Sequence, residues 1–411
     1  MQDVPIGHHE RRGPSKWTIE AALLLVQFGM GLGFLSPAPL FPLIIDEYDV
    51  SRAAASLLVG GTSLGVALAL VPASILPARI GTRWAVTLGG VLLASMLLTP
   101  LANSFAMLLV LRILFSLGAA VLLSALPAVV VRWFEPRELA LVNGLGIVAQ
   151  TLGVATSMSV AASIAAVVGW HLTLTLFAAV VGSATVVWVV MSSGAANDAG
   201  GAAALSMRDI RDVAGDRLTV LLGLGFAGAL GANISFASWL PTYYQEQFAF
   251  SLERAGQTAS VLTIFGMIGS LLGSVLPMRF PRRKPFLLLA GLLMPVAGVG
   301  CFLGTSNAVL LPSLALFGVA TSIFIPVMMT IPMEASRIGP ARAGVAVSVI
   351  LGAGNFSGFV VPLLVGTARD VSGTFVFGLA IAGCLALALA VSALVIPETG
   401  PVLARPAQQS A

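Results

Sequence analysis

Long apolar segments recur along the whole chain and are separated by short stretches that hold most of the charged residues. Each segment has about twenty residues or more, and a helix of that length crosses a hydrocarbon core about 30 Å thick. Lipid offers no partner for a free backbone amide, and membrane strands would be ~10 residues of alternating polarity, so these segments predict helices. We therefore expect an all-α polytopic membrane protein with twelve transmembrane helices. Their predicted ranges are 19–45, 53–77, 83–103, 105–133, 139–168, 170–191, 218–248, 255–278, 286–303, 308–331, 342–366 and 374–396.

A polar stretch in the middle of the chain, residues 192–217, divides these segments into six and six. It opens with a Ser/Gly/Ala-rich run and closes with apolar residues at helical spacing, such as Met207 and Ile210, opposite Arg208. This pattern predicts a flexible linker and a short amphipathic helix on the cytoplasmic surface. The expected organisation is a cytoplasmic tail (1–18), a six-helix bundle (19–191), the linker (192–217), a second six-helix bundle (218–396) and a cytoplasmic tail (397–411).

Composition agrees with lipid as the solvent, because 58% of the residues are hydrophobic and only 9% are charged. The net charge of +4 does not indicate a nucleic-acid partner, since most of the 21 Lys and Arg residues are sorted onto one set of loops. Only Arg52, Arg254 and Arg369 lie on the opposite loops. The positive-inside rule then places both termini in the cytoplasm of a bacterial-type inner membrane. The lipid bilayer is the expected partner, and we expect a monomer.

The loop between the second and third spans is repeated in the second half of the chain. Ser74, Leu76, Pro77, Arg79 and Arg83 match, at constant spacing, Ser274, Leu276, Pro277, Arg279 and Arg283. The two six-helix bundles are therefore expected to be pseudo-repeats. Transporters use such paired halves to place a site at their interface and to rock the halves around it.

This arrangement resembles the major facilitator superfamily, and the resemblance covers essentially the whole chain. The residues that match the signature loop of that family and its copy in the second half are Arg79, Gly81, Arg83, Arg279, Arg282 and Arg283. The chain departs from the signature at Ala78 and Met278, where an acidic residue is usual before the first arginine. The resemblance implies a transporter that works by alternating access.

Within that superfamily, residues 352–362 of the eleventh span and residues 239–243 of the seventh resemble organic-anion and sugar-acid symporters and cyanate/nitrate-type porters. The chain keeps an arginine in the fourth span, Arg112, but has Ala119 where those symporters carry a glutamate. The resemblance implies a small anionic substrate.

Arg112 lies about seven residues into its span, on the order of 10 Å deep at 1.5 Å per residue. A charge at that depth costs at least ~2.5 kcal/mol unless it faces a wet cavity or a partner. Its planar guanidinium suits a carboxylate or a nitrate-like oxyanion, so we predict that Arg112 anchors the substrate. The alternative is a structural arginine that bonds carbonyls of a neighbouring helix.

Four amide side chains near the middle of spans are further candidates for substrate binding: Gln27, Gln150, Asn233 and Asn355. Each must form hydrogen bonds in a medium without water. The alternative for each is a hydrogen bond to a neighbouring helix, which is common in membrane bundles.

Prolines interrupt the first span at Pro37 and Pro39, and a similar segment with Trp239, Tyr243 and Tyr244 follows in the seventh span. We expect both spans to be broken there, because matched interruptions in repeat-related helices indicate a pathway and its gates. The two tyrosines are predicted to close the external gate, or alternatively to lie in an interfacial aromatic belt.

No Asp or Glu lies clearly inside a span, since Glu20 and Glu334 fall at span ends. Proton relays in transporters usually need such a carboxylate, so this pattern disfavours a proton-driven drug antiporter. Cys301 and Cys384 lie in apolar spans and indicate neither a disulfide nor a thiolate metal site. His171 is expected to have no Cys, His or acidic neighbour that would build a catalytic or metal site. We expect no metal, no cofactor and no enzymatic activity.

These observations favour a secondary active or facilitative transporter of a small organic or inorganic anion, with or without a coupling ion. The chain has no Gly-x-x-x-x-Gly-Lys motif, so it is not by itself a primary pump. An efflux carrier for apolar metabolites or drugs is the alternative transporter. A membrane sensor with a transporter fold is the remaining alternative.

Overall fold

The computed structural model describes residues 15–73, 76–134, 139–192, 207–280, 282–304, 306–335 and 340–399. Within these ranges there are helices and no strands, and 12 helical segments are long and apolar enough to cross a membrane. The prediction of an all-α fold with twelve spans is confirmed. The tail before residue 15, the linker residues 193–206 and the tail after residue 399 lie outside the described residues.

The first half, called here the N-half, contains α1 (Lys16–Phe34), η1 (Ala38–Leu40), α2 (Phe41–Tyr48), α3 (Arg52–Ala73), α4 (Leu76–Ile80), α5 (Thr82–Leu93), η2 (Ala94–Leu101), α6 (Phe105–Trp133), α7 (Leu139–Val168) and α8 (Trp170–Met191). A short helix, α9 (Met207–Ala214), precedes the second half. The second half, the C-half, contains α10 (Arg217–Phe248), α11 (Leu252–Arg279), α12 (Lys284–Leu303), α13 (Asn307–Glu334), α14 (Pro340–Ser372), α15 (Val376–Leu385) and α16 (Leu387–Val395).

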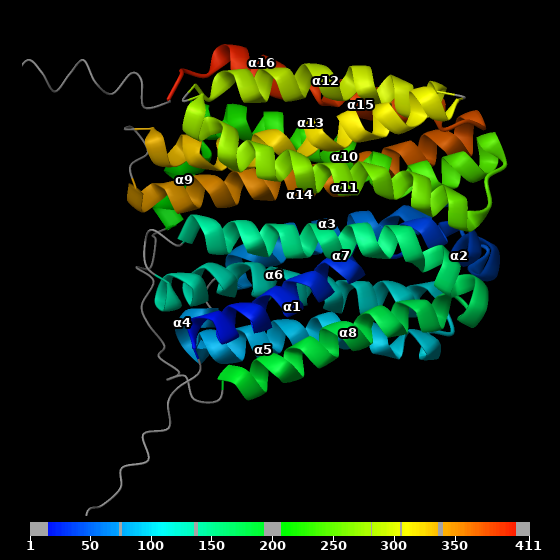
Figure 1. Cartoon of the computed structure of the whole chain (residues 1–411), viewed down its shortest axis with the longest axis horizontal. Coiled ribbons are helices and arrows are strands. Elements are labelled where there is room, and N and C mark those ends of the chain that lie inside the picture. Colours follow the sequence, from blue (N-terminus) through cyan, green and yellow to red (C-terminus); the bar gives the residue numbers. More distant parts are fainter. Residues whose placement is uncertain are drawn as a thin grey trace, which may run out of the picture.

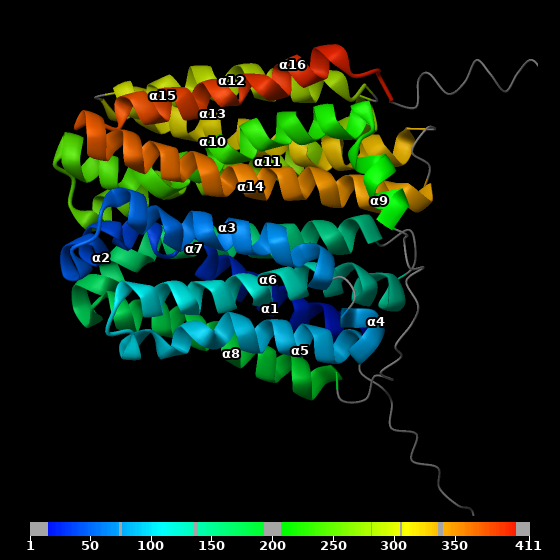
Figure 2. The same ribbon diagram turned by 180° about the vertical axis from the view of Figure 1, so that it is seen from behind.

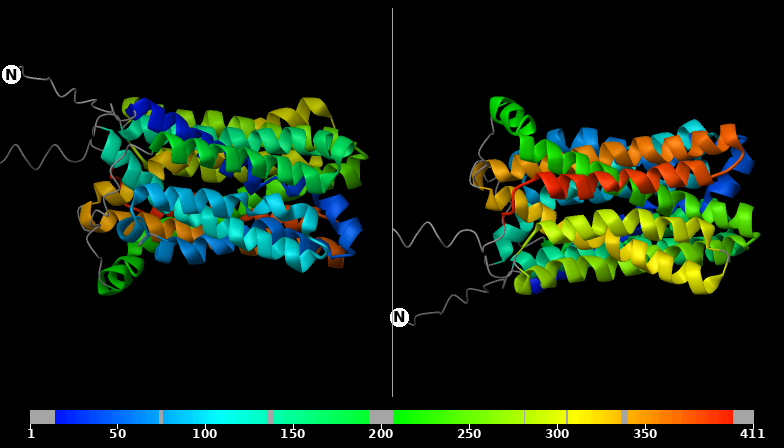
Figure 3. Two further views of the ribbon diagram at one scale, coloured as in Figure 1. Left: turned by 90° about the horizontal axis from the view of Figure 1, so that it is seen from below. Right: turned by 90° about the horizontal axis from the view of Figure 1, so that it is seen from above.

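The two halves lie side by side, with their helices running roughly along the long axis of the molecule (Figures 1 and 2). Helix α1 begins and α16 ends at the same end of the bundle, where α9 also lies (Figure 3). We call this the linker end, and the opposite end, where α3 and α11 begin, the distal end. An even number of spans requires this common location of the first and last helical residues.

The halves meet along two pairs of helices, α3 against α14 and α7 against α11. Small residues permit the close approach of backbones in these contacts. A Cβ atom added to Gly60 of α3 would lie 3.0 Å from the carbonyl oxygen of Phe359 in α14. A Cβ added to Gly256 of α11 would lie 2.9 Å from the carbonyl oxygen of Met158 in α7. Larger side chains at these two glycines would therefore push the halves apart.

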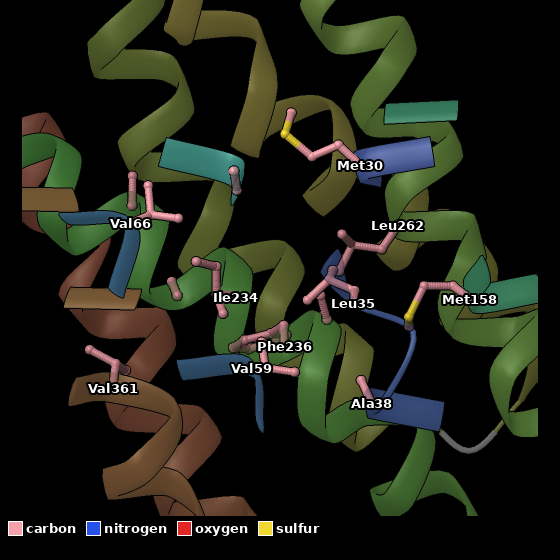
Figure 4. Packing of buried hydrophobic residues seen from close by; sticks show 14 of the residues in the cluster. Met30, Leu35, Ala38, Val59, Val66, Met158, Ile234, Phe236, Leu262 and Val361 are labelled. Carbon is pink, nitrogen blue, oxygen red and sulfur yellow. The ribbon is translucent and has the colours of Figure 1, made fainter. Parts of the chain in front are cut away.

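One apolar cluster of buried side chains spans both halves. Figure 4 shows part of this cluster, with Leu35 and Met158 of the N-half and Ile234 and Leu262 of the C-half among the labelled side chains. Dispersion contacts of this kind drive helix association in lipid, where the hydrophobic effect between helices is small. The interface between the halves is thus packed at this level of the bundle.

The two predicted proline interruptions have different outcomes. The first span is broken as expected, because α1 ends at Phe34 and the chain passes through η1 into α2. The predicted break in the seventh span is wrong, since α10 is continuous from Arg217 to Phe248 with Pro241 inside it. A single proline removes one helical hydrogen bond. The side chains that precede and follow Pro241 are buried against neighbouring helices, and this packing holds the helix together.

Candidate functional site

Arg112 lies in the middle of the N-half and is 1% exposed. Its guanidinium donates three hydrogen bonds to backbone carbonyls: Nε to Leu58 at 2.7 Å, Nη1 to Gly33 at 2.8 Å and Nη2 to Phe34 at 2.8 Å. The guanidinium carbon also lies 4.8 Å from the centre of the Phe115 ring. Gly33 and Phe34 are the last residues of α1, where the helix leaves carbonyls without partners.

This geometry explains how a charge is held at such depth. Arg112 of α6 joins the end of α1 to the middle of α3, and the carbonyl dipoles offset the loss of hydration. In this conformation Arg112 bonds carbonyls of neighbouring helices, as expected of a structural arginine. The role of Arg112 as a substrate anchor stays a prediction.

The four candidate amides are divided between the halves, with Gln27 on α1, Gln150 on α7, Asn233 on α10 and Asn355 on α14. All four are half-buried. Asn355 donates to the carbonyl of Leu351 in its own helix at 2.9 Å. The side chains of Gln27, Gln150 and Asn233 have no hydrogen-bond partner among the described residues. Their role in substrate binding stays a prediction.

Gln27 and Gln150 belong to one contact between α1 and α7. A Cβ added to Gly146 of α7 would lie 2.5 Å from the amide oxygen of Gln27, and a Cβ added to Gly31 of α1 would lie 2.0 Å from the carbonyl oxygen of Gln150. Gly146 and Gln150 are one helical turn apart. The two amide side chains are thus carried by adjacent turns of two tightly packed helices.

Trp239 lies at the interface between the halves and is fully buried. Its ring is 5.2 Å from that of Phe41 in the N-half, measured between centroids, and its Nε1 donates to the carbonyl of Pro362 in α14 at 2.9 Å. The η1 turn with Pro39 contacts α10, α7 and α11, and Pro37 precedes it. Trp239 and the η1 turn thus lie where the halves touch, and their gating role stays a prediction.

Tyr243 and Tyr244 are buried within the C-half. Their hydroxyls donate to the carbonyls of Phe302 and Cys301, respectively, at the end of α12. This burial does not fit an aromatic belt exposed to the membrane interface. Both bonds stay inside one half, so the tyrosines rigidify the C-half in this conformation, and their gating role stays a prediction.

The two signature loops at the linker end differ in their partners. Arg283 forms an ion pair with Glu334 at 2.7 Å, and its backbone N–H donates to Glu398 at 2.7 Å. Arg83 donates instead to the carbonyl of Val189 at 3.1 Å, and its Nε is buried without a partner among the described residues. In the C-half, acids from distant segments thus pair with Arg283. Gly81 precedes α5 with a φ of 82°, a conformation that favours glycine, while Arg79, Arg279 and Arg282 are exposed.

A group of charged residues at the distal end was not predicted from the sequence. It consists of Arg52, Glu246, Arg369 and Asp370 and is named here the distal charge cluster. Arg52 of the N-half bonds Glu246 of the C-half at 2.7 Å and lies 3.8 Å from Asp370. Arg369 bonds the other oxygen of Glu246 at 2.8 Å. The sorting of these arginines onto the opposite loops was visible in the sequence, but their pairing was not, because the partners are far apart along the chain.

Two further acids have surroundings that the sequence did not predict. Glu20 lies in the second turn of α1 and is 2% exposed, and both of its carboxylate oxygens lack a hydrogen-bond partner among the described residues. Its spacing of seven residues from Gln27 could have indicated a position on the same helix face. Glu47 lies 3.2 Å from His171 Nε2, so this histidine does have an acidic neighbour in space.

Comparisons with known proteins agree with this architecture. The sequence profile of the Major Facilitator Superfamily matches residues 23–362. A probable L-galactonate transporter of Escherichia coli K12 is 24% identical over 94% of this chain and 91% of its own length. An uncharacterised protein of Campylobacter jejuni is 24% identical over 79% of this chain and 99% of its own length. A bacterial homologue of the human lysosomal transporter Spinster, crystallised in an inward-facing and unoccupied conformation, shares the fold with a TM-score of 0.69 at 16% identity, over 92% of this chain and 94% of that one.

Proposed function

Since the chain belongs to the Major Facilitator Superfamily and is a multi-pass membrane transporter of a small molecule, we propose that its solute is a small organic anion of the sugar-acid type. Transport proceeds by alternating access, in which the N-half and the C-half rock around a site between them. The observation that carries the choice of substrate class is the near full-length similarity to a probable L-galactonate transporter.

The amide side chains fit such a substrate. A sugar acid presents several hydroxyls and one carboxylate, and amides offer both donors and acceptors for them. Gln27, Gln150 and Asn233 are half-buried and have no partner among the described residues, and they come from both halves. We assign the recognition of the hydroxyls to these amides. Arg112 lies on the same half as Gln27 and Gln150 and adds a positive potential that favours an anion over a neutral sugar.

The linker end faces the cytoplasm of a bacterial-type inner membrane in this proposal, and the distal end faces outward. This orientation follows from the positive-inside rule, because only Arg52, Arg254 and Arg369 of the 21 Lys and Arg residues lie on distal loops. The polar bonds of the distal charge cluster join the halves at the outward side. The conformation is thus closed toward the outside.

A ligand screen tests the substrate class. Purified protein in detergent is heated with six-carbon sugar acids, nitrate or lipophilic cations, because a ligand that binds only the folded state raises its stability. The proposal predicts a dose-dependent rise in melting temperature with sugar acids, reduced in Gln150→Ala and retained in Gln257→Ala, a matched control on an exposed face of α11. A rise with lipophilic cations alone would contradict the proposal and support an efflux carrier.

A further inference from the structure

The distal charge cluster contains one cation that crosses between the halves. Arg52 is the first residue of α3 in the N-half, and it donates to Glu246 Oε1 through Nε at 3.0 Å and through Nη2 at 2.7 Å. Arg369 donates to the other oxygen of the same carboxylate at 2.8 Å, but it belongs to the C-half, like Glu246 itself. The ion pair between the halves at Glu246 is therefore made by Arg52, whereas the ion pair of Arg369 stays within the C-half.

Asp370 makes a second connection between the halves. Its Oδ2 accepts a hydrogen bond from the backbone N–H of Ala53 at 3.1 Å, and its Oδ1 lies 3.8 Å from Arg52 Nη1. Ala53 is in the first turn of α3, where N–H groups have no partner within the helix and the helix dipole favours a negative charge. A carboxylate of the C-half thus caps a helix of the N-half.

The backbones approach closely at the same place. A Cβ added to Gly366 of α14 would lie 3.1 Å from the carbonyl oxygen of Arg52 and 2.8 Å from the ring of Trp239. That ring in turn contacts Phe41 of the N-half. The charged layer therefore lies next to an apolar seal, and neither can persist when the distal ends of the halves move apart.

Polar groups lie beneath this closure. A cavity of about 220 Å³ between the halves is lined by Arg52, Asp46 and Glu246 and also by Thr242 of α10. Thr242 is 3% exposed, and its hydroxyl has no partner among the described residues. Ser238 and Ser235 follow on α10 at spacings of four and three residues, away from the distal end, and their buried hydroxyls are also unpartnered in the described structure. This spacing places the three hydroxyls on one helix face.

We propose that the distal charge cluster is the lock of the outward gate, and that it closes a polar route along the hydroxyl face of α10. This inference rests on the proposed alternating-access function and adds which bonds hold the outward side shut. When the distal end opens, water replaces the bonds between Arg52, Glu246 and Asp370. These three side chains are already 25–31% exposed. A lock of partly exposed ion pairs is weak enough to open in each cycle.

The lock is tested by the distance between the halves at the distal end. Spin labels on Val167→Cys at the end of α7 and Val371→Cys near the end of α14 report this distance, and both positions are more than 80% exposed. Cys384 is replaced by Ala and the buried Cys301 is kept. Pulsed electron resonance in lipid nanodiscs then gives the distribution of distances. We expect Arg52→Ala to increase the population with the longer distance on the order of fivefold, and Arg52→Lys to restore most of the short-distance population.

Arg369→Ala is the matched control, because it removes an arginine from the same carboxylate without removing a bond between the halves. The expected result is a distance distribution like that of the parent. An unchanged distribution in Arg52→Ala, or an equal increase in Arg369→Ala, would overturn the lock. Neither outcome bears on the substrate class, since the measurement uses no substrate, and a failure of sugar acids to bind would leave the distances unaffected.

Access of water along the hydroxyl face of α10 is measured separately. Ser238→Cys, in the same background without the spin-label sites, is treated with a small water-soluble thiol reagent in nanodiscs. The rate of modification is expected to rise in Arg52→Ala about as much as the open population does, and to stay at the parent value in Arg369→Ala. No rise in Arg52→Ala, in a variant whose distal distance has increased, would overturn the route along α10.

Discussion

Two arginines at different places in the molecule show two ways of holding a positive charge. Arg112 lies inside the N-half, is 1% exposed, and bonds three backbone carbonyls. Arg52 lies between the halves, with 31% of its side chain exposed, and bonds carboxylates of the C-half. The first arginine is surrounded by helices of one half, and the second connects the two halves.

The difference reflects what must move. The contacts of Arg112 come from α1 and α3, which share a half with α6, so they can persist while the halves rock. The bonds of Arg52 must break whenever the distal end opens, and partial exposure lowers the cost because water replaces the carboxylates. A buried charge with permanent carbonyl partners thus supports one rigid half, and an exposed ion pair supports a reversible contact.

The largest effect is expected for Arg112→Ala. Removing the guanidinium removes three buried hydrogen bonds and leaves the Phe34 carbonyl without a donor among the described residues, while Gly33 and Leu58 still accept from the hydroxyls of Ser36 and Thr62. Hydrogen bonds from a charged group contribute about 1.5–3 kcal/mol each, so the stability should fall by about 3 kcal/mol or more. Thermal unfolding followed by intrinsic fluorescence in detergent measures this loss, with Arg254→Ala as the exposed control. If Arg112→Ala instead melts like the parent and only loses the shift caused by sugar acids, the arginine is a substrate anchor and the comparison fails.

A smaller effect of opposite sign is expected for Glu20→Gln. Glu20 is as buried as Arg112, but its carboxylate has no hydrogen-bond partner among the described residues. Replacing a buried unpaired acid by a neutral amide of the same shape should stabilise the protein at neutral pH by about 1 kcal/mol. The same unfolding assay measures it, and Glu253→Gln on the exposed start of α11 is the control. A loss of stability in Glu20→Gln would mean that the acid has a stabilising partner.

The smallest change in stability is expected for Arg52→Ala. Ion pairs between partly exposed side chains contribute about 0.2–1 kcal/mol, so the melting temperature should change little while the distal distances increase. Unfolding assays and distance measurements on the same sample separate these two effects. A destabilisation as large as that of Arg112→Ala would show that the distal charge cluster is part of the folded core and would contradict a reversible contact.

The sequence predicted the features that depend on local pattern. The twelve spans, the division into two repeated halves and the depth of Arg112 all follow from apolar runs about twenty residues long. The partners of Arg112 could not be predicted in this way. Depth in a span requires a partner for the charge, but backbone carbonyls have no signature in the sequence, so the anchor and the structural arginine could not be distinguished.

Long-range pairing and packing account for the other differences. Arg52 and Glu246 are 194 residues apart, and only the docking of the halves brings them together. Glu20 lies near the start of α1, as the sequence places it, but its burial was not predicted because the linear pattern does not show what packs around a helix end. Pro241 predicted a break, but burial of the surrounding residues keeps α10 continuous. In each case tertiary contacts, which the linear pattern does not contain, decided the outcome.

Transport by the purified protein in liposomes shows whether the chain moves a sugar acid across a membrane. Vesicles loaded with an unlabelled six-carbon sugar acid receive a trace of the labelled acid outside, so that exchange through an alternating site accumulates label. We expect accumulation of label that Gln150→Ala reduces and Gln257→Ala does not. Dose-dependent binding of the sugar acid in the ligand screen, with no accumulation above that of protein-free vesicles, would contradict the claim and favour a sensor with a transporter fold.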